Sequence, residues 1–258
     1  MLIGAMNHPA ANPIGEIRWM AELKLDFIDL TLEPPGAATW RIDAKAIRKE
    51  LAATGLKVVG HTAYYLPLCS PFESLRRAAV DELKICIEQF AVIGAKWMNL
   101  HPDRHAPMHD RRFIIERNLQ TVHDLLPTAD ECGVGLMIEN LPGDFNSVEQ
   151  LGELLDPIPE LGLHLDIGHS NLMVKHNSAA EIVRKYGARL KHVHLHDNKG
   201  GAADLHLPLG TGNVDAPAEL RMLKESGYNE TITLEVFSAD RHYLAYSRDV
   251  VQKLWNSL

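Results

Sequence analysis

Residues 190–206 read LKHVHLHDNKGGAADLH, and the rest of the chain can be interpreted outward from this stretch. In an extended strand His192, His194 and His196 lie on one face, because successive side chains alternate between the two faces. A Gly-Gly turn and an Asp-x-His pair at residues 204–206 follow. Buried ionisable groups are costly unless they are paired or bind a metal. The stretch therefore predicts a strand that ends in a metal site, provided that other strands bring further ligands to it.

On both sides of this stretch, short runs typical of β-strands alternate with runs typical of helices. Eight strand–helix units follow one another without a linker or a low-complexity segment, which predicts an α/β protein with a single (β/α)8 TIM-barrel domain over residues 1–258. The expected strands are residues 2–7, 27–33, 57–61, 97–101, 135–140, 161–166, 190–196 and 231–237. The expected helices are residues 14–23, 43–53, 71–93, 110–131, 147–155, 179–186, 216–225 and 239–254.

A doubly wound open sheet is the competing architecture. It requires a glycine-rich phosphate turn after an early strand, whereas the first expected strand here ends in Asn7-His8-Pro9. Six consecutive expected strands, the third to the eighth, carry an imidazole or a carboxylate near their carboxyl ends. A closed barrel gathers such groups at one mouth, whereas an open sheet spreads them along a line, so the pattern favours the barrel. These residues are His61, His101, Glu139, Asp166 with His169, His194 with His196, and Glu235.

Composition excludes several classes of protein. The chain has 26 Lys and Arg against 34 Asp and Glu, a formal net charge of −8, and no basic run that would attract nucleic acid. Three widely spaced cysteines indicate reduced thiols and a cytoplasmic protein rather than a disulfide framework or a thiolate zinc site. No signal peptide or membrane span is expected from the first residues, MLIGAMNHPAANP.

The residue types at the strand ends indicate the kind of metal. Imidazoles mixed with carboxylates, without thiolates, suit Zn²⁺, Mn²⁺, Co²⁺ or Fe²⁺ better than Ca²⁺. The set exceeds what one ion can use, so either several ions bind or some of the residues contact substrate. Two weaker candidates lie nearby. Backbone amides of the Gly210–Asn213 loop are a weak candidate for holding a phosphate. Aromatic residues just beyond strand ends either stack on a sugar or base or simply pack their loops: Trp40, Tyr64, Tyr65, Phe145 and Phe237.

The motifs of this chain, in their order, resemble those of the xylose isomerase-like TIM-barrel superfamily. That superfamily joins endonuclease IV with sugar and sugar-phosphate isomerases and epimerases. The resemblance covers nearly the whole chain and implies the barrel fold and a divalent metal at the strand ends. The motifs are HTAYYLPLCSP from His61, NLHPD from Asn99, IEN from Ile138, DIGHS from Asp166, HLHDNKG from His194, DLH from Asp204 and LEVF from Leu234.

The resemblance implies one of two uses of these residues. In the ketose-epimerase-like branch a single Mn²⁺ or similar ion is held by residues matching Glu139, Asp166, His194 and Glu235. The two glutamates also move the proton on the substrate carbon, and the residue matching His169 contacts substrate. In endonuclease IV three zinc ions use a larger set. The resemblance to endonuclease IV implies one ion at His61, His101 and Glu139, a second at Glu139, Asp166, His194 and Glu235, and a third at His169, Asp204 and His206.

The loops favour the isomerase branch, although a matching residue is present at all nine nuclease positions. Nuclease affinity comes largely from Lys and Arg contacts with phosphates, and the loops after the expected strands contain few of either. Endonuclease IV also typically has Asn where this chain has His196. We therefore predict a metal-dependent isomerase or epimerase of a sugar or sugar phosphate, and the alternative is an endonuclease IV-like phosphodiesterase. The expected catalytic residues are Glu139 and Glu235, and the expected substrate contacts are His169, Tyr64, Lys199 and His196. One to three Zn²⁺ or Mn²⁺ ions and a possible homodimer complete the prediction, with nucleic acid an improbable partner.

Overall fold

The structure is a computed structural model that describes Met1–Leu258 and contains eight strands and eight α-helices. The strands are β1 (Leu2–Met6), β2 (Phe27–Leu32), β3 (Lys57–Thr62), β4 (Trp97–Leu100), β5 (Gly135–Glu139), β6 (Gly162–Asp166), β7 (Leu190–Leu195) and β8 (Thr231–Leu234). The helices are α1 (Pro13–Glu22), α2 (Ala44–Thr54), α3 (Glu73–Ile93), α4 (Arg111–Cys132), α5 (Val148–Leu155), α6 (Ala179–Tyr186), α7 (Ala216–Glu225) and α8 (His242–Ser257). Every predicted element is present.

The strand order is β1 to β8 in a closed parallel barrel, which confirms the predicted (β/α)8 TIM-barrel fold. The chain packs as two compact units. The N-terminal unit comprises Asn7–Glu139 and Gly152–Gly162, and the C-terminal unit comprises Met1–Met6, Asn140–Leu151 and Leu163–Leu258. Each unit holds four strands and its own set of polar residues, and each is described below by itself.

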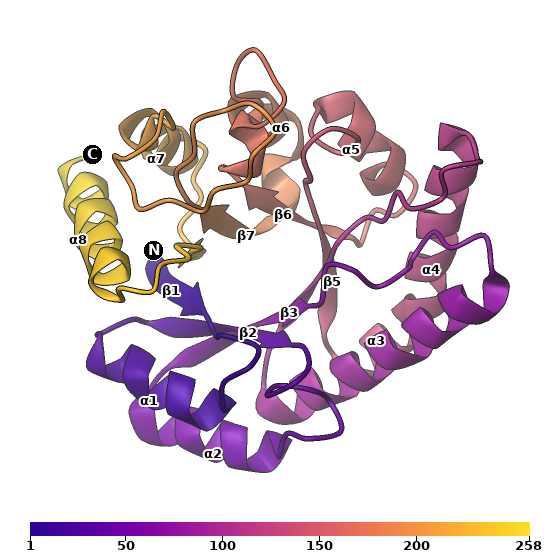
Figure 1. Cartoon of the computed structure of the whole chain (residues 1–258), viewed down its shortest axis with the longest axis horizontal. Helices are drawn as coiled ribbons and strands as arrows, with labels where there is room; N and C mark the ends of the chain where they lie inside the picture. The colour runs from indigo at the N-terminus through magenta and orange to yellow at the C-terminus, as the bar shows by residue number, and fades with distance from the viewer. The chain divides into compact units, whose positions relative to one another are not determined.

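In the N-terminal unit β2, β3, β4 and β5 pair in chain order, all parallel. The register places Thr31 of β2 beside His61 of β3. All six residues of β2 are buried, as expected for a parallel strand that is covered on both faces. Helices α3 and α4 run side by side (Figure 1), and the fully buried side chain of Arg76 lies between them.

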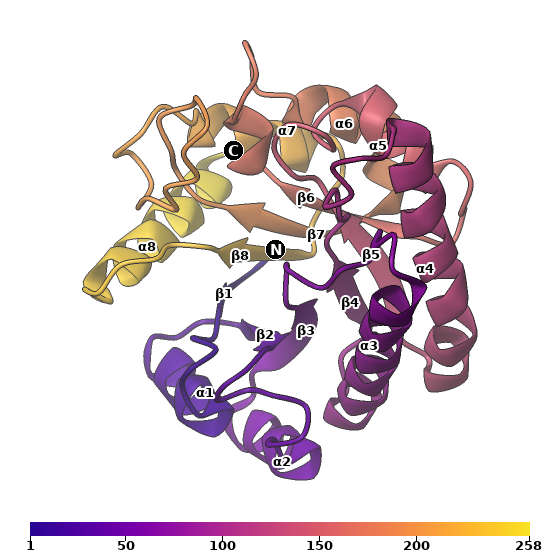
Figure 2. The ribbon, with the colours of Figure 1, turned by 45° about the vertical axis from the view of Figure 1, so that its right-hand side comes forward.

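In the C-terminal unit β6 pairs with β7, β7 with β8, and β8 with β1. Figure 2 shows β6, β7 and β8 as neighbouring strands. The register places Asp166 of β6 beside His194 of β7, and His194 beside Thr233 of β8. Parallel pairing in this register brings the carboxyl ends of three strands to one place, because strands in register end together. The site in this unit therefore follows from the pairing.

Capping residues account for where several helices begin and end. Asp43, Asp110 and Asp215 each accept a backbone N–H from the first turn of α2, α4 and α7, at 3.0, 2.9 and 3.0 Å respectively. An N-cap carboxylate satisfies one of the donors that a helix leaves unpaired at its start. Gly94 ends α3 with φ of 105°, a conformation that a residue with a side chain rarely adopts. No helix is both long enough and apolar enough to span a membrane.

The prediction was wrong at the end of the last strand. β8 ends at Leu234 rather than at residue 237, and α8 begins at His242 rather than at residue 239. The reason lies in the pairing partners, because the backbone N–H of Phe237 donates to the carbonyl of His206, a loop residue, at 3.1 Å. Glu235 therefore follows the strand directly instead of lying within it.

Candidate metal centre

The predicted ligands of the N-terminal unit form a buried group around Glu139. Nε2 of His101 lies 2.9 Å from Oε2 of Glu139, and Nε2 of His61 lies 4.0 Å from the same oxygen. Asn99, at the third position of β4, donates its side-chain N–H to that oxygen at 3.1 Å. The three ligand candidates are between 1% and 7% exposed. Two imidazoles and a carboxylate held this close can bind a divalent ion.

In the C-terminal unit the strand ends bring two carboxylates to one imidazole. Nδ1 of His194 lies 3.3 Å from Oε2 of Glu235 and 3.8 Å from Oδ2 of Asp166. All three residues are buried, and Asp166 and His194 are fully so. Two buried carboxylates beside one imidazole carry charge that a cation bound among them would compensate. The donor set, with oxygen from Asp and Glu and nitrogen from His, suits Zn²⁺ or Mn²⁺.

Asn140, the residue after β5, holds the backbone of this site in place. Its side-chain oxygen accepts the N–H of Asp166 at 2.7 Å, and its side-chain nitrogen donates to the carbonyl of Asp166 at 2.9 Å. Its own carbonyl oxygen lies 2.9 Å from Nδ1 of His169. The N–H of His169 donates to Oδ1 of Asp166 at 2.8 Å. Asn140 thereby fixes the positions of two predicted ligands at once.

A second group in the C-terminal unit surrounds Asp204. Its Oδ2 lies 3.1 Å from Nε2 of His169 and 3.0 Å from Nε2 of His206. Burial by itself raises the pKa of Asp204, but the hydrogen bonds from the two histidines hold that pKa well below its usual range. Burial lowers the pKa of His206, but Asp204 and Glu235 outweigh it and raise the pKa to about 10. The carboxylate of Asp204 is therefore ionised at neutral pH and is available as a ligand.

Glu235 lies between the two groups of the C-terminal unit. Its Oε2 is 3.3 Å from Nδ1 of His194 and 3.4 Å from Nδ1 of His206. Burial raises the pKa of Glu235, but the charge of His194 and the hydrogen bonds from His194 and His206 lower it below its ordinary value. This carboxylate is consequently ionised at neutral pH, and it can act as a ligand or as a proton acceptor.

His196 is fully buried beside both groups. Its Nε2 lies 3.4 Å from Oδ1 of Asp166 and 3.6 Å from Oδ1 of Asp204, and makes no hydrogen bond. Its ring stacks on that of His206, with the centroids 4.3 Å apart. We expected His196 to contact substrate; the structure places it among the candidate ligands.

The loop after β7 is held by a carboxylate that sequence reasoning missed. Asp197 is buried, and its two oxygens accept four backbone N–H groups. The donors are Asn198 (2.9 Å), Gly210 (2.9 Å), Gly212 (2.8 Å) and Val214 (3.0 Å). The amides of Gly210 and Gly212 are thus occupied, so the suggested phosphate cradle at residues 210–213 is wrong. Its glycines serve a close approach instead, because a Cβ on Gly212 would lie 2.0 Å from the carbonyl oxygen of Asn198.

Deeper in the strands of the C-terminal unit, His164, His192 and His194 form a buried cluster, with ring centroids between 4.1 and 5.1 Å apart. The two ring nitrogens of His192 lie 2.7 and 3.0 Å from the hydroxyl oxygens of Thr231 and Thr233. The two threonine hydroxyls thus hold the ring of His192 in place, and the three imidazoles are close enough together to hold an ion.

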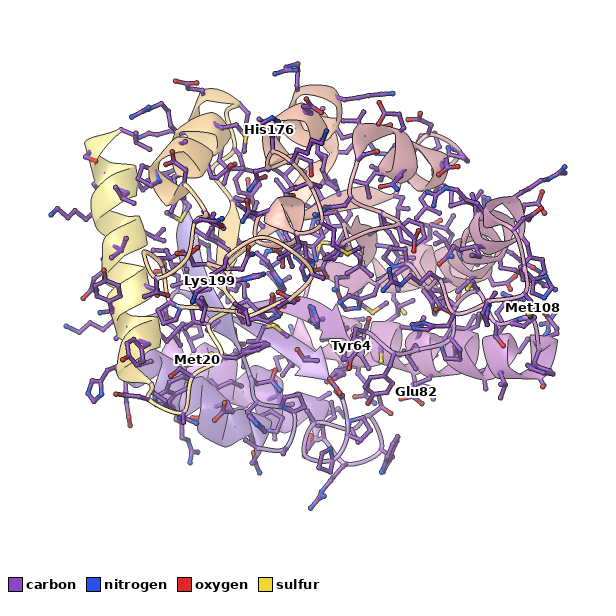
Figure 3. The ribbon with its side chains drawn as sticks, turned by 45° about the horizontal axis from the view of Figure 1, so that its top comes forward. Met20, Tyr64, Glu82, Met108, His176 and Lys199 are labelled. Atoms are coloured by element: carbon purple, nitrogen blue, oxygen red, sulfur yellow. The ribbon has the colours of Figure 1, made fainter.

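The residues expected around the site differ in accessibility. Tyr64 and Trp40 are 72% and 75% exposed, whereas Phe145 is buried and packs within its loop. Phe237 stacks on the ring of His206 at 4.4 Å. Figure 3 labels Tyr64 in the loop after β3 and Lys199 in the loop between β7 and α7, and Lys199 is exposed. Tyr64 and Lys199 are thus accessible to solvent, and their contact with substrate stays a prediction.

Comparison with known proteins assigns the chain to a family. The sequence model described as "Xylose isomerase-like TIM barrel" matches residues 17–254. An uncharacterised protein of Methanocaldococcus jannaschii is 30% identical over 179 residues, which are 68% of each chain. A second uncharacterised protein of the same organism is 30% identical over 172 residues, and this chain spans only 58% of the length of that protein. A "Probable endonuclease 4" of Thermotoga sp. strain RQ2 is 24% identical over 198 residues, 66% of each chain.

Solved structures with the same fold include several epimerases. A "D-tagatose 3-epimerase-like protein" superposes with a TM-score of 0.87 at 23% identity, covering 100% of this chain and 98% of the other. D-psicose 3-epimerase from Clostridium cellulolyticum H10, solved with D-tagatose, superposes with a TM-score of 0.80 at 16% identity, covering 100% and 99%. At these identities the likeness is one of fold.

Proposed function

Because the chain belongs to the xylose isomerase-like TIM-barrel family, we propose that it is a metal-dependent isomerase or epimerase of a sugar or sugar phosphate. The convergence of Asp166, His194 and Glu235 carries the proposal. Nδ1 of His194 lies 3.3 Å from Oε2 of Glu235 and 3.8 Å from Oδ2 of Asp166. Two ligands about 2.0–2.1 Å from one tetrahedral ion are about 3.3 Å apart, so an ion fits among them. Glu139, at the end of β5, is proposed as the fourth ligand because its IEN motif resembles that of the ketose-epimerase-like branch.

The proposed reaction moves a proton at the carbon next to a carbonyl. A bound divalent ion supplies Lewis acidity, which makes that C–H more acidic. Glu235 is the proposed base on one side, because its pKa lies below the ordinary value and the carboxylate is ionised at neutral pH. Glu139 is the proposed partner in the proton transfer, as its resemblance to the second glutamate of the ketose-epimerase-like branch implies.

Deuterium uptake tests this proposal directly. A panel of ketoses and their phosphates is incubated with the enzyme in heavy water, and uptake at the carbon next to the carbonyl is followed by NMR. Uptake is expected for at least one member of the panel. Glu139→Gln and Glu235→Gln should each lower its rate about 10²–10⁴-fold, the range of general acid–base catalysis. Glu225→Gln, an exposed glutamate on α7, is the matched control and should leave the rate unchanged.

A nuclease is the second candidate, because relatives described as "Probable endonuclease 4" match this chain and the residues of both additional ligand groups lie close enough together to hold ions. The net charge of −8 argues against it, since phosphate contacts need Lys and Arg. Incision of duplex DNA at an abasic site, with binding that weakens steeply as salt rises and no deuterium uptake from any ketose, would reverse the order of the two candidates.

A further inference from the structure

We propose that His196 is a fourth protein ligand of an ion held with His169, Asp204 and His206, and that it closes this coordination site to substrate. The four residues come from the C-terminal unit, and their candidate ligand atoms lie within 4.8 Å of one another. The proposal concerns a second ion, distinct from the one assigned to Asp166, His194 and Glu235. It does not depend on the reaction proposed above.

All three imidazoles are oriented in the same way. Nδ1 of His169, His196 and His206 lies 2.9, 3.3 and 3.3 Å from the main-chain carbonyl oxygens of Asn140, Asp197 and Glu235, respectively. An Nδ1–H that donates to a carbonyl leaves the lone pair on Nε2, and metal-binding histidines are typically oriented by such bonds. The backbone therefore directs three Nε2 atoms towards Asp204, where a bound ion would displace the protons through which His169 and His206 contact the carboxylate.

The spacing around Asp204 fits a small ion. Its oxygens lie 3.1, 3.0 and 3.6 Å from Nε2 of His169, His206 and His196. Two ligands of one tetrahedral zinc lie about 3.3 Å apart when each bond is about 2.0–2.1 Å long. One carboxylate and three imidazoles are also a donor set that Zn²⁺ accepts.

The Nε2 atom of His196 is the observation that separates this site from a three-residue one. It is buried in a fully buried side chain and makes no hydrogen bond, although a buried polar atom normally has a partner. Gly168, in the loop after β6, explains how the ring reaches this position. A Cβ built on Gly168 would lie 2.1, 2.3 and 2.5 Å from Nε2, Cε1 and Cδ2 of His196. Such nearly equal distances put that Cβ over the face of the ring, so Gly168 makes room for the ring without obstructing the in-plane lone pair.

The assignment to Asp204 rather than to Asp166 follows from the other contacts of each carboxylate. Nε2 of His196 is nearly equidistant from Oδ1 of Asp166 and Oδ1 of Asp204. Oδ1 of Asp166 already accepts the N–H of His169 at 2.8 Å. Oδ2 of Asp204 faces both other imidazoles. The remaining imidazoles thus gather at Asp204, and His196 completes their set.

Four protein ligands have a functional consequence. Zinc sites with four protein ligands are typically structural, whereas catalytic sites keep one position open for water or substrate. An ion at His169, Asp204 and His206 alone would keep an open position. With His196 added, the ion stabilises the loop that carries Asp204 and His206, and it offers no position to a phosphate or sugar oxygen.

The test is a crystal structure of the zinc-loaded wild-type protein with anomalous data at the zinc edge. We expect a peak with Nε2 of His169, His196 and His206 and an oxygen of Asp204 as its ligands, at about 2.0–2.2 Å each. Three outcomes would overturn the proposal. They are an ion with water in place of His196, an ion shared by His196 and Asp166, and no ion here while other sites are filled.

Zinc titration of variants provides a second readout that does not need activity. His196→Ala should weaken the affinity for one of the bound zinc ions at least about 100-fold, since even the loss of a residue that only orients a ligand lowers metal affinity about 10–100-fold. Gly168→Ala should weaken the affinity for the same zinc ion, because the added methyl group displaces the ring of His196 while all four ligand residues remain. His123→Ala, an exposed histidine on α4, is the matched control. Unchanged zinc affinity in folded His196→Ala protein, checked by circular dichroism, would contradict the assignment.

Discussion

At the residue scale, the loop after β7 depends on a single side chain. Asp197 is 1% exposed and accepts four backbone N–H groups from residues on both sides of the Gly-Gly turn. A buried carboxylate is tolerated only where donors compensate its charge, and here the backbone supplies all of them. Asp204 and His206 lie within the loop closed by these bonds, so the candidate ligands keep their positions because Asp197 holds both ends of the loop.

Replacing Asp197 with Asn should lower the free energy of unfolding by about 3 kcal/mol. The amide nitrogen would face two of the four donors, and each buried N–H left without an acceptor costs about 1–3 kcal/mol. Urea denaturation followed by circular dichroism measures the change. Asp215→Asn is the matched control, because Asp215 is the exposed N-cap of α7 and Asn caps a helix about as well as Asp. Equal effects of the two substitutions would contradict this account of Asp197.

At the element scale, α3 and α4 are joined through a buried arginine. Nη1 of Arg76 lies 2.8 Å from Oδ2 of Asp124 and 3.0 Å from Oγ1 of Thr121, both on α4. Nη2 and Nε contact Glu73, one turn earlier on α3, at 2.8 and 3.0 Å. The planar guanidinium has five N–H donors, so one side chain can satisfy all of these partners. An arginine on the inner face of a helix would otherwise break its apolar pattern.

Arg76→Ala should destabilise the protein by about 2–3 kcal/mol. Breaking a buried ion pair typically costs about 3–5 kcal/mol, but Glu73 and Asp124 are partly exposed and water can replace part of the lost contact. Arg77→Ala offers a matched control on the same helix. Arg77 also contacts Glu73, but its side chain is 68% exposed, and an exposed pair contributes about 0–1 kcal/mol. Thermal and urea denaturation compare the two; a larger loss for Arg77 would refute the role given to Arg76.

At the scale of the whole molecule, metal binding and stability are expected to be linked. Each unit gathers buried carboxylates and imidazoles from strands and loops that are far apart in the sequence. Such groups come together only in the folded chain. An ion that binds them therefore stabilises the folded state by mass action.

Removal of bound metal should lower the melting temperature by about 5–10 °C. An ion present at about 100 times its dissociation constant stabilises the folded state by about 2.7 kcal/mol, and 1 kcal/mol shifts the melting temperature of a protein of this size by about 2–4 °C. Differential scanning calorimetry with and without EDTA measures the shift, and added Zn²⁺ or Mn²⁺ should reverse it. A melting temperature that is the same with and without EDTA, in protein shown to contain metal, would contradict the linkage.

The sequence by itself determined the fold and the strand ends at which the candidate ligands lie. Hydrophobic period and capping residues are local signals, so all eight strands and eight helices were predicted within a few residues of their bounds. The widest error was at residues 235–241, where pairing with a loop, rather than local preference, ends β8. Polar residues at strand ends could be recognised for the same reason, because a strand end is a local feature.

Only the tertiary structure decided which of these residues lie together. His196 follows His194 by two residues and both rings lie near Asp166, yet Nδ1 of His194 also faces Glu235, whereas Nε2 of His196 also faces Asp204. The role of Asp197 depends on amides 13 to 17 residues further along the chain. Loop residues follow no period, and their partners are chosen by which backbone donors remain unpaired once the chain has turned back. Contacts of this kind depend on three-dimensional packing, which a linear pattern of residue types does not record.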